Sequence, residues 1–225
     1  LLRPAINKEI FYKCNVEKKY DLVYCGRIAK EKNLDFLLGL SKKYSILLIG
    51  NGPYYKQYKS KITNKHNIHM IGELKHSELA KYYQLGKIFI TPSKTETLGF
   101  TTLEALSCGI PAICMNSYGS KDIFKWGSHL GYTFGFLIDN HSDAVTSIDK
   151  ILNNTTLYES FCNDGLKFTE KLTWDMSVTD LESKYTKVID NYKKKNIFKK
   201  IGIILFYIIV SILTKILKVI ITIVN

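Results

Sequence analysis

Six short apolar runs, separated by longer stretches with helical spacing, constrain the fold of this chain more than any other feature. The runs occupy residues 21–25, 46–50, 68–71, 88–91, 110–114 and 135–138. The helical stretches lie between them, at residues 34–40, 54–66, 77–85 and 101–107. Strands that alternate with helices in this way are typical of βαβ units. The sequence therefore predicts an α/β fold with a doubly wound, parallel, Rossmann-like sheet.

A sheet of this kind binds ligands beyond the carboxyl ends of its strands, in the loops that lead into the helices. In this chain those loops follow Cys25, Gly50, Ile71 and Thr91. The charged and glycine-rich motifs of the chain fall in these four loops, so we expect them to meet at one edge of the sheet.

The loop after Thr91 carries two glutamates, Glu96 and Glu104, eight positions apart around a turn. We expect Glu96 in the loop and Glu104 just over one turn into the following helix. Between them stand the residues whose backbone N–H groups would face a ligand: Leu98, Gly99, Phe100 and Thr101. Because the N-terminus of a helix attracts anions, this arrangement suits a ligand that carries both phosphate and hydroxyl groups.

A simpler explanation exists for the same residues. The spacing Thr101-x-x-Glu104 is that of a capping box, in which Glu104 accepts the backbone N–H of Thr101. Glu96 would then be an ordinary solvated loop residue. For two isolated glutamates this explanation is the better one, but their position after a strand, and a second motif upstream, favour a ligand site.

The second motif follows Cys25 and reads Gly26-Arg27-Ile-Ala-Lys-Glu-Lys32-Asn. Gly26 allows the backbone to turn closely at the end of the strand. Arg27 and Lys32 can converge on one anion, the first as a rigid fork of donors and the second as a mobile point charge. Alone, the motif reads as a solvated basic loop. At the same sheet edge as Glu96, it predicts a clamp for a diphosphate.

Two further loops would shape the cleft without adding a charged cluster. The motif Gly50-Asn-Gly52-Pro is too short for a dinucleotide fingerprint and lacks the Walker A pattern. It predicts a tight turn that keeps the cleft open to a ligand. The stretch Ile71-Gly-Glu-Leu is expected to line a base pocket with its backbone groups.

The sequence contains no recognisable metal motif. No Asp-x-Asp pair occurs, and His66 and His69 stand in a polar stretch without a third ligand nearby. The five cysteines are scattered and odd in number, which indicates free thiols in a reducing compartment. We therefore expect neither a metal nor another cofactor, and Arg27, Lys32 and the helix amides would have to neutralise a bound phosphate.

Much of the positive charge of the chain lies in its C-terminal tail. Seven lysines and no acidic residue occur from Lys193 onward, in a chain of 225 residues with a net charge of +12. This concentration predicts an anionic membrane surface, and not nucleic acid, as the partner.

An apolar run begins at Ile201, and Lys215 and Lys218 interrupt it. Each lysine would cost roughly 2.5–3.5 kcal/mol near the centre of a membrane span. The polar residues of the run share one helix face, which favours a helix that lies in the membrane interface. A helix that covers another domain is the alternative.

In three motifs taken in order, the chain resembles the C-terminal, donor-binding half of GT-B glycosyltransferases, specifically glycosyltransferase family 4. The motifs are G-R-x-x-x-E-K, G-x-G-P and P-S-x-x-E-x-L-G-F-x-x-L-E-A-L-x-C-G-x-P. The resemblance covers residues 2–192, and its E-x7-E segment is the most specific part.

The resemblance implies a role for each charged residue of the motifs. Glu96 would contact the transferred sugar and Glu104 the ribose hydroxyls of a nucleotide-diphosphate sugar. Arg27 and Lys32 would hold the diphosphate, so that Glu96, Arg27 and Lys32 form the catalytic set. The implied reaction is retaining, metal-independent glycosyl transfer of the hexosyltransferase type, with the nucleotide sugar as donor substrate.

The chain also departs from the family pattern. The usual G-G-x-P-E of the next loop appears as Tyr118-Gly119-Ser-Lys-Asp122. The N-terminal GT-B domain, which in the family binds the acceptor and usually supplies a catalytic histidine, is absent, and residues 2–7 resemble the interdomain linker. We therefore expect a nucleotide-sugar-binding domain at residues 1–192, a basic linker and membrane-associated helix at 193–225, and a chain that is incomplete for catalysis.

Three functional interpretations use the same donor cleft. The leading one is the donor half of a glycosyltransferase on the cytoplasmic face of a membrane, peripheral or tail-anchored, that builds a cell-surface glycan or glycolipid. A nucleotide-sugar epimerase of GT-B fold would use different catalytic carboxylates. A membrane-bound nucleotide-sugar-binding partner would lack the acceptor domain altogether.

Overall fold

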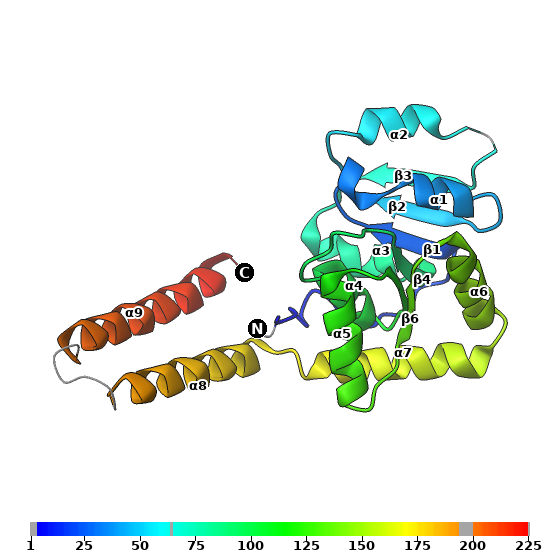
Figure 1. Ribbon diagram of the computed structural model, residues 1–225. Helices are drawn as coiled ribbons and strands as arrows, with labels where there is room; N and C mark the ends of the chain where they lie inside the picture. The colour runs from blue at the N-terminus through cyan, green and yellow to red at the C-terminus, as the bar shows by residue number, and fades with distance from the viewer. Residues whose placement is uncertain (1–3, 64, 194–199, 225) are drawn as a thin grey trace. The chain divides into compact units, whose positions relative to one another are not determined.

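The computed structural model describes residues 4–63, 65–193 and 200–224 (Figure 1). The chain divides into two compact units, one that extends to Met176 and one that begins at Ser177. The division falls earlier than the expected boundary after residue 192. The reason is that α8 (Trp174–Lys193), from Ser177 onward, packs within the second unit.

The first unit is built on one parallel sheet. Its described strands are β1 (Tyr20–Cys25), β2 (Ile46–Ile49), β3 (Ile68–Gly72), β4 (Gly86–Thr91), β5 (Ala112–Met115) and β6 (Gly135–Ile138). They lie in the order β3-β2-β1-β4-β5-β6 and pair in parallel throughout. This confirms the predicted doubly wound sheet, in which the strand order reverses between β1 and β4.

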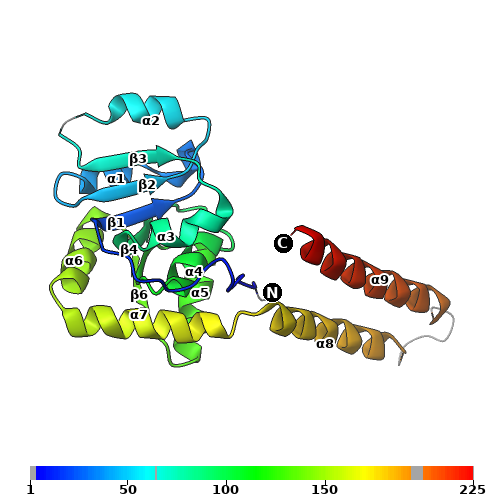
Figure 2. The same ribbon diagram turned by 180° about the vertical axis from the view of Figure 1, so that it is seen from behind.

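Helices cover both faces of the sheet (Figures 1 and 2). The connecting helices are α1 (Asp35–Leu40), α2 (Tyr55–Lys61), α3 (Leu79–Tyr83), α4 (Phe100–Ser107), α5 (Tyr118–His129), α6 (His141–Leu152) and α7 (Thr155–Glu170), with short 3-10 turns η1 (Lys30–Lys32) and η2 (His76–Glu78). Helices α1, α2 and α6 share one core with Leu22 and Tyr24, whereas α3, α4 and α5 share the other with Val23 and Cys25. Alternate residues of β1 therefore enter opposite cores, as a strand buried on both faces requires.

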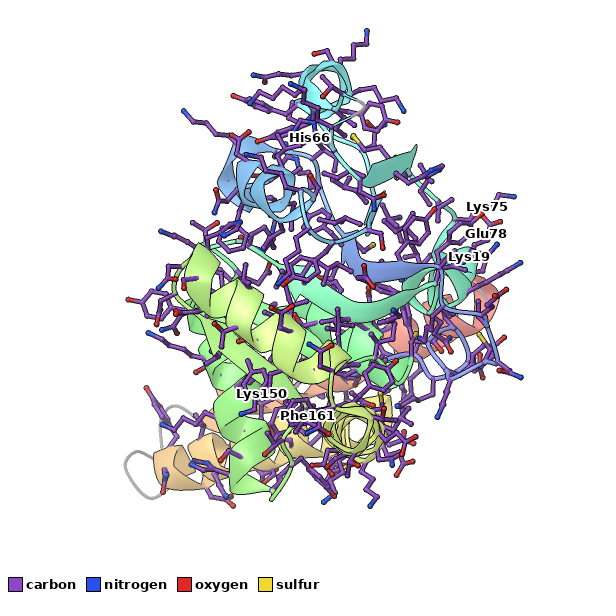
Figure 3. The ribbon with its side chains drawn as sticks, turned by 90° about the vertical axis from the view of Figure 1, so that its right-hand side faces the viewer. Lys19, His66, Lys75, Glu78, Lys150 and Phe161 are labelled. Carbon is purple, nitrogen blue, oxygen red and sulfur yellow. The ribbon has the colours of Figure 1, made fainter. Side chains whose placement is uncertain are left out.

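Helix α7 lies beyond β6, at the opposite edge of the sheet from α2 (Figure 2). It contributes Phe161 to one core and Phe168 to the other. Phe161 meets the ring of Phe136 edge-on at 5.3 Å, and Lys150 of α6 covers that ring at 5.2 Å. Figure 3 shows Lys150 and Phe161 close together at this edge. Helix α7 thus contributes to the cores on both faces of the sheet.

Residues 118–122, expected to be a loop, form the first turn of α5. Ser117 caps the helix, because its hydroxyl oxygen accepts the backbone N–H of Ser120 at 3.3 Å. Ile123 and Gly127, four residues apart, are both buried toward the sheet. The departure from the family motif therefore lies at a helix N-terminus beside the loop that carries Glu96.

The second unit contains α8 and α9 (Lys200–Val224). Tyr185 of α8 meets Phe206 of α9 with ring centroids 6.2 Å apart. Much of the predicted basic linker, at residues 194–199, lies outside the described residues. Among the described residues, no helix combines the length and the hydropathy that a membrane span requires.

Candidate functional site

A cleft lies at the carboxyl ends of the strands, where the strand order reverses. Its wider part, of about 800 Å³, lies over the loops that follow β1, β2 and β3. A narrower part, of about 440 Å³, lies between the loops that follow β1 and β4. Cys25, Gly26 and Arg27 line both parts, so the two parts adjoin each other. Its position is the one that doubly wound sheets use for ligands.

The floor of the wider part depends on a close approach between two loops. A Cβ atom on Gly50 would lie 2.0 Å from the carbonyl oxygen of Gly26, and one on Gly52 would lie 2.4 Å from that of Ile28. The N–H of Ile28 also donates to the carbonyl of Asn51 at 2.9 Å. The Gly-x-Gly motif therefore does more than turn the chain, because it lets the loop that carries Arg27 rest on its neighbour.

Two predicted residues from separate motifs meet across the narrower part. The ammonium of Lys32 lies 2.9 Å from Oε2 of Glu96, and the two side chains are only 22% and 17% exposed. Asn33 holds the loops in this position, because its side-chain amide donates to the carbonyl of Pro92 at 3.3 Å. A cation and a carboxylate thus face one small volume at the β1/β4 edge.

Glu96 is also tied to the beginning of two helices. Its Oε1 accepts the N–H of Gly99, the N-cap of α4, at 3.3 Å. Its backbone carbonyl accepts the N–H of Gly119 in the first turn of α5 at 2.9 Å. A Cβ on Gly119 would lie 2.5 Å from the carbonyl carbon of Thr97, so α5 can rest on the Glu96 loop only with a glycine at this position.

The first turn of α4 opens into the narrower part of the cleft. Phe100 and Thr101 line it. The N–H groups of a first helical turn have no acceptor within the helix, and the helix dipole places partial positive charge there. The first turn of α4 therefore faces the part of the cleft where the sequence predicts an anion.

The capping-box explanation of Glu104 is wrong. Helix α4 begins at Phe100 with Gly99 as its N-cap, so Thr101 lies inside the helix. The carboxylate of Glu104 instead accepts the hydroxyl of Tyr83 at 2.6 Å. Burial raises the pKa of Glu104 above its usual value, against the opposing effects of the Tyr83 hydrogen bond and of His76.

Arg27 lies at the solvent-exposed side of the cleft. Its side chain is 66% exposed, and its guanidinium lies 4.0 Å from the carboxylate of Glu31. The backbone of Arg27 is better fixed than the side chain, because its carbonyl accepts the buried hydroxyl of Tyr24 at 3.1 Å. The charge is therefore available to a ligand in either part of the cleft.

The structure brings most of the predicted residues together. The residues that line the cleft are Gly26, Arg27, Lys32, Gly50, Gly52, Glu96, Phe100 and Thr101. Gly99 is the N-cap of α4, Leu98 is 48% exposed in the loop before it, and the side chain of Glu104 is 14% exposed; none of the three is among the residues that line the two parts of the cleft. Ile71 packs against the core, and Glu73 and Leu74 line the cleft in its place.

Sequence reasoning missed His76 and Tyr83. His76 lines the wider part of the cleft, and Tyr83 is fully buried beside Glu104. Neither belongs to a recognisable motif, and Tyr83 reads as one more apolar position of a helical stretch. Across the described residues, no group of three or more His, Cys, Asp or Glu side chains is placed to hold a metal ion.

The family of glycosyl transferases group 1 matches residues 6–168 of this chain. Sulfoquinovosyl transferase SQD2 of Arabidopsis thaliana is 29% identical over 180 residues, which cover 78% of this chain and 35% of the relative. Alpha-monoglucosyldiacylglycerol synthase of Acholeplasma laidlawii is 27% identical over 184 residues, which cover 77% of this chain and 45% of the relative.

Among solved structures, sucrose-phosphate synthase from Thermosynechococcus elongatus matches with a TM-score of 0.70. The sequence identity is 19%, and the match covers 84% of this chain and 52% of that protein. At this identity the likeness shows the fold alone. The chain spans about half, or less, of the length of the proteins that it matches.

Proposed function

This chain belongs to the family of glycosyl transferases group 1, and from that membership we propose that it is the donor-binding half of a retaining, metal-independent glycosyltransferase of family 4. The donor is a nucleotide-diphosphate sugar. The observation that carries the proposal is the meeting of Lys32 and Glu96 at 2.9 Å, in the part of the cleft that Arg27 and the first turn of α4 also line. The relatives are longer than this chain, so the activity of the whole protein is part of the proposal.

The geometry suits the junction between a sugar and a diphosphate. Glu96 accepts hydroxyl groups of the sugar, whereas Lys32, Arg27 and the amides of the first turn of α4 face the diphosphate. When the bond between the anomeric carbon and the diphosphate oxygen breaks, negative charge grows on the leaving oxygen. Fixed donors stabilise this charge more in the transition state than in the bound donor, and so they lower the barrier. These groups supply the positive charge that a metal ion would otherwise provide.

Calorimetry with a panel of nucleotide sugars tests the proposal. We expect one of them to bind with a Kd between about 1 μM and 1 mM, the range of most enzyme–substrate affinities. The matching nucleoside diphosphate should compete, and the free sugar should not. In Lys32→Ala the affinity should fall by about tenfold or more, because a charge-assisted hydrogen bond is lost. If no nucleotide sugar binds the wild-type protein, the proposal is wrong.

We further propose that the acceptor is a cell-surface glycan or a glycolipid and that an N-terminal GT-B domain binds it. The relatives are roughly two to three times longer than the part they share with this chain, which leaves room for such a domain. One of them is named as a synthase of a glucosyl lipid. A product analysis with the complete enzyme and a lipid extract would contradict this assignment if no lipid or glycan became labelled from the donor.

We also propose that the protein works on the cytoplasmic face of a membrane, with α9 in the interface. The apolar side chains of α9 that are about half exposed are Phe206, Tyr207, Ile208, Ile209, Ile212, Leu213, Ile216 and Leu217. Lys215 and Lys218 are exposed on the same helix, and the tail holds no acidic residue. Such a combination of apolar surface and positive charge supports binding to anionic lipid.

Sedimentation with lipid vesicles tests this part of the proposal. The protein should pellet with phosphatidylcholine vesicles that contain phosphatidylserine, and much less with phosphatidylcholine alone or at high salt. A chain that ends at Tyr192 should stay in the supernatant. Ile212→Asn is a matched control that keeps every lysine and should weaken binding without abolishing it. Undiminished pelleting of the shortened chain would show that α9 is not the anchor.

A further inference from the structure

A groove of about 310 Å³ lies between α8 and α9, within the second unit. Most of the side chains that line it are apolar, among them Leu181, Tyr185 and Ile189 of α8 and Phe206, Tyr207 and Val210 of α9. The rings of Tyr185 and Phe206 lie 6.2 Å apart, so the two helices are in contact where these aromatic side chains gather. The groove is separate from the donor cleft, because none of its lining residues belongs to the first unit.

The lining residues follow the length of both helices. On α8 they extend from Val178 to Ile189, which corresponds to roughly 16 Å of helix. On α9 they extend from Phe206 to Thr214, or roughly 12 Å. A volume of about 310 Å³ spread over such a length leaves a small cross-section. This shape suits an extended hydrocarbon chain better than a compact ring system.

The threonine hydroxyls in the wall of the groove are satisfied within their own helices. Thr186 donates to the backbone carbonyl of Glu182 at 2.8 Å. Thr214 donates to the carbonyls of Val210 and Ser211 at 2.9 and 3.0 Å. Neither hydroxyl therefore requires a hydrogen-bond partner from a ligand. Because Glu182 is exposed, its carboxylate remains in water when the apolar part of the groove is filled.

Two lysines of α9 stand at one end of the groove. Lys215 follows Ser211 by four residues, and Ser211 lines the groove. Lys218 follows Thr214 by four residues, and Thr214 lines it as well. Residues four apart share one face of a helix, so both lysines lie about one turn beyond lining residues. Both are exposed, and this end of the groove presents positive charge to an anionic group.

An amphiphile with an anionic head group combines the properties that the groove requires. Apolar side chains of α9 that do not line the groove, such as Ile209 and Ile212, are about half exposed. In the proposed interfacial location they lie among lipid chains, which places hydrocarbon next to the groove. A second copy of this chain is a poorer occupant, because its tail carries seven lysines and no acidic residue from Lys193 onward, and like charges would oppose the pairing.

We propose that the groove between α8 and α9 binds one acyl chain of an anionic membrane lipid and that Lys215 and Lys218 hold its head group. The inference rests on the proposed membrane location. It adds a site that takes one lipid per chain, in place of a general attraction between the tail and a charged surface.

Native mass spectrometry and calorimetry with the full chain test the inference. The probes are palmitoyl lysophosphatidylglycerol, which is anionic, and palmitoyl lysophosphatidylcholine, which is zwitterionic, each below its critical micelle concentration. We expect one molecule of the anionic lipid per chain. Its affinity should exceed that of the zwitterionic lipid by about 10- to 30-fold, because each lysine near an anionic group contributes about a fivefold gain. Lys215→Gln combined with Lys218→Gln should remove most of this preference.

Two tryptophan variants separate the groove from the outer surface of α9. Val210→Trp places a large side chain in the groove and should lower the affinity for the anionic lipid by about tenfold or more. Ile209→Trp is the matched control, because Ile209 is 49% exposed and does not line the groove, and its affinity should stay near the wild-type value. Leu181→Trp fills the groove from α8 and should reproduce the loss. Circular dichroism checks that each variant keeps its helices.

Sedimentation with the phosphatidylserine vesicles distinguishes the two ways in which the inference can fail. Val210→Trp should still pellet, because it keeps every lysine and the exposed apolar face of α9. If the wild-type protein does not pellet, the proposed membrane location fails and this inference with it. If it pellets but binds no lysolipid saturably, or if Val210→Trp and Ile209→Trp lose the same affinity, the inference alone is overturned. A lipid-free dimer that Val210→Trp dissociates would also overturn it, since a second copy would then fill the groove.

Discussion

Replacing Arg27 with alanine is expected to lower the turnover of the complete enzyme by about 10²- to 10³-fold, the usual cost of one preorganised donor to a developing charge. The fold should not change. The side chain is 66% exposed, and its ion pair with Glu31 has an N–O distance of 4.0 Å. Exposed pairs of this kind contribute about 0–1 kcal/mol to stability. Steady-state kinetics with the donor and a urea unfolding curve would measure the two quantities separately.

Two variants of the same loop sharpen the Arg27 experiment. Arg27→Lys keeps the charge but loses the rigid fork of donors, so its turnover should lie between those of the wild type and the alanine variant. Lys30→Ala removes an exposed lysine of the same loop that does not line the cleft, and its turnover should remain near the wild-type value. Wild-type turnover in Arg27→Ala would show that Arg27 does not hold the diphosphate.

The sheet and the location of the cleft could be predicted because both follow from local patterns. Each observed strand begins and ends within two residues of the expected run. Lys32 and Glu96 are 64 residues apart in the sequence, yet their proximity follows from a general rule. The carboxyl ends of neighbouring parallel strands lie at one edge of a sheet, so loops that follow β1 and β4 must meet there.

The surroundings of Glu104 could not be predicted in the same way. Its position one turn into a helix follows from spacing, but its hydrogen bond to Tyr83 depends on how α3 and α4 pack on one face of the sheet. No local pattern encodes that packing. The local spacing to Thr101 instead suggested a capping box, because the sequence does not show that Gly99 is the N-cap.

Helix α5 was missed for a different reason. Gly119 and Gly127 lower its intrinsic helix propensity, by roughly 1 kcal/mol each relative to alanine. Both are needed for packing, since a Cβ on Gly127 would lie 2.3 Å from the ring of Phe134 and one on Gly119 would lie 2.5 Å from the backbone of Thr97. Tertiary contacts thus decide the conformation against the local preference. The cap at Ser117 was the one local signal of a helix start.

Replacing Gly50 with alanine is expected to destabilise the first unit by about 3–5 kcal/mol. Two costs add together in this variant. The backbone has φ +136°, a conformation that costs a residue with a side chain about 1–3 kcal/mol. The new Cβ would also lie 2.0 Å from the carbonyl oxygen of Gly26, and backbone atoms must move to relieve such a contact. Because the displaced loop carries Arg27, donor affinity should fall as well.

Gly131→Ala is the matched control for this prediction. Gly131 also has a positive φ, of +80°, but a Cβ there would meet nothing within 4 Å. Its alanine variant should therefore lose only the conformational cost, about 1–2 kcal/mol, and keep the donor affinity of the wild type. Urea unfolding and donor calorimetry on both variants would separate the cost of the backbone conformation from the cost of the contact between the new Cβ and Gly26. Equal destabilisation of the two proteins would mean that the contact between Gly50 and the Gly26 loop does not support the cleft.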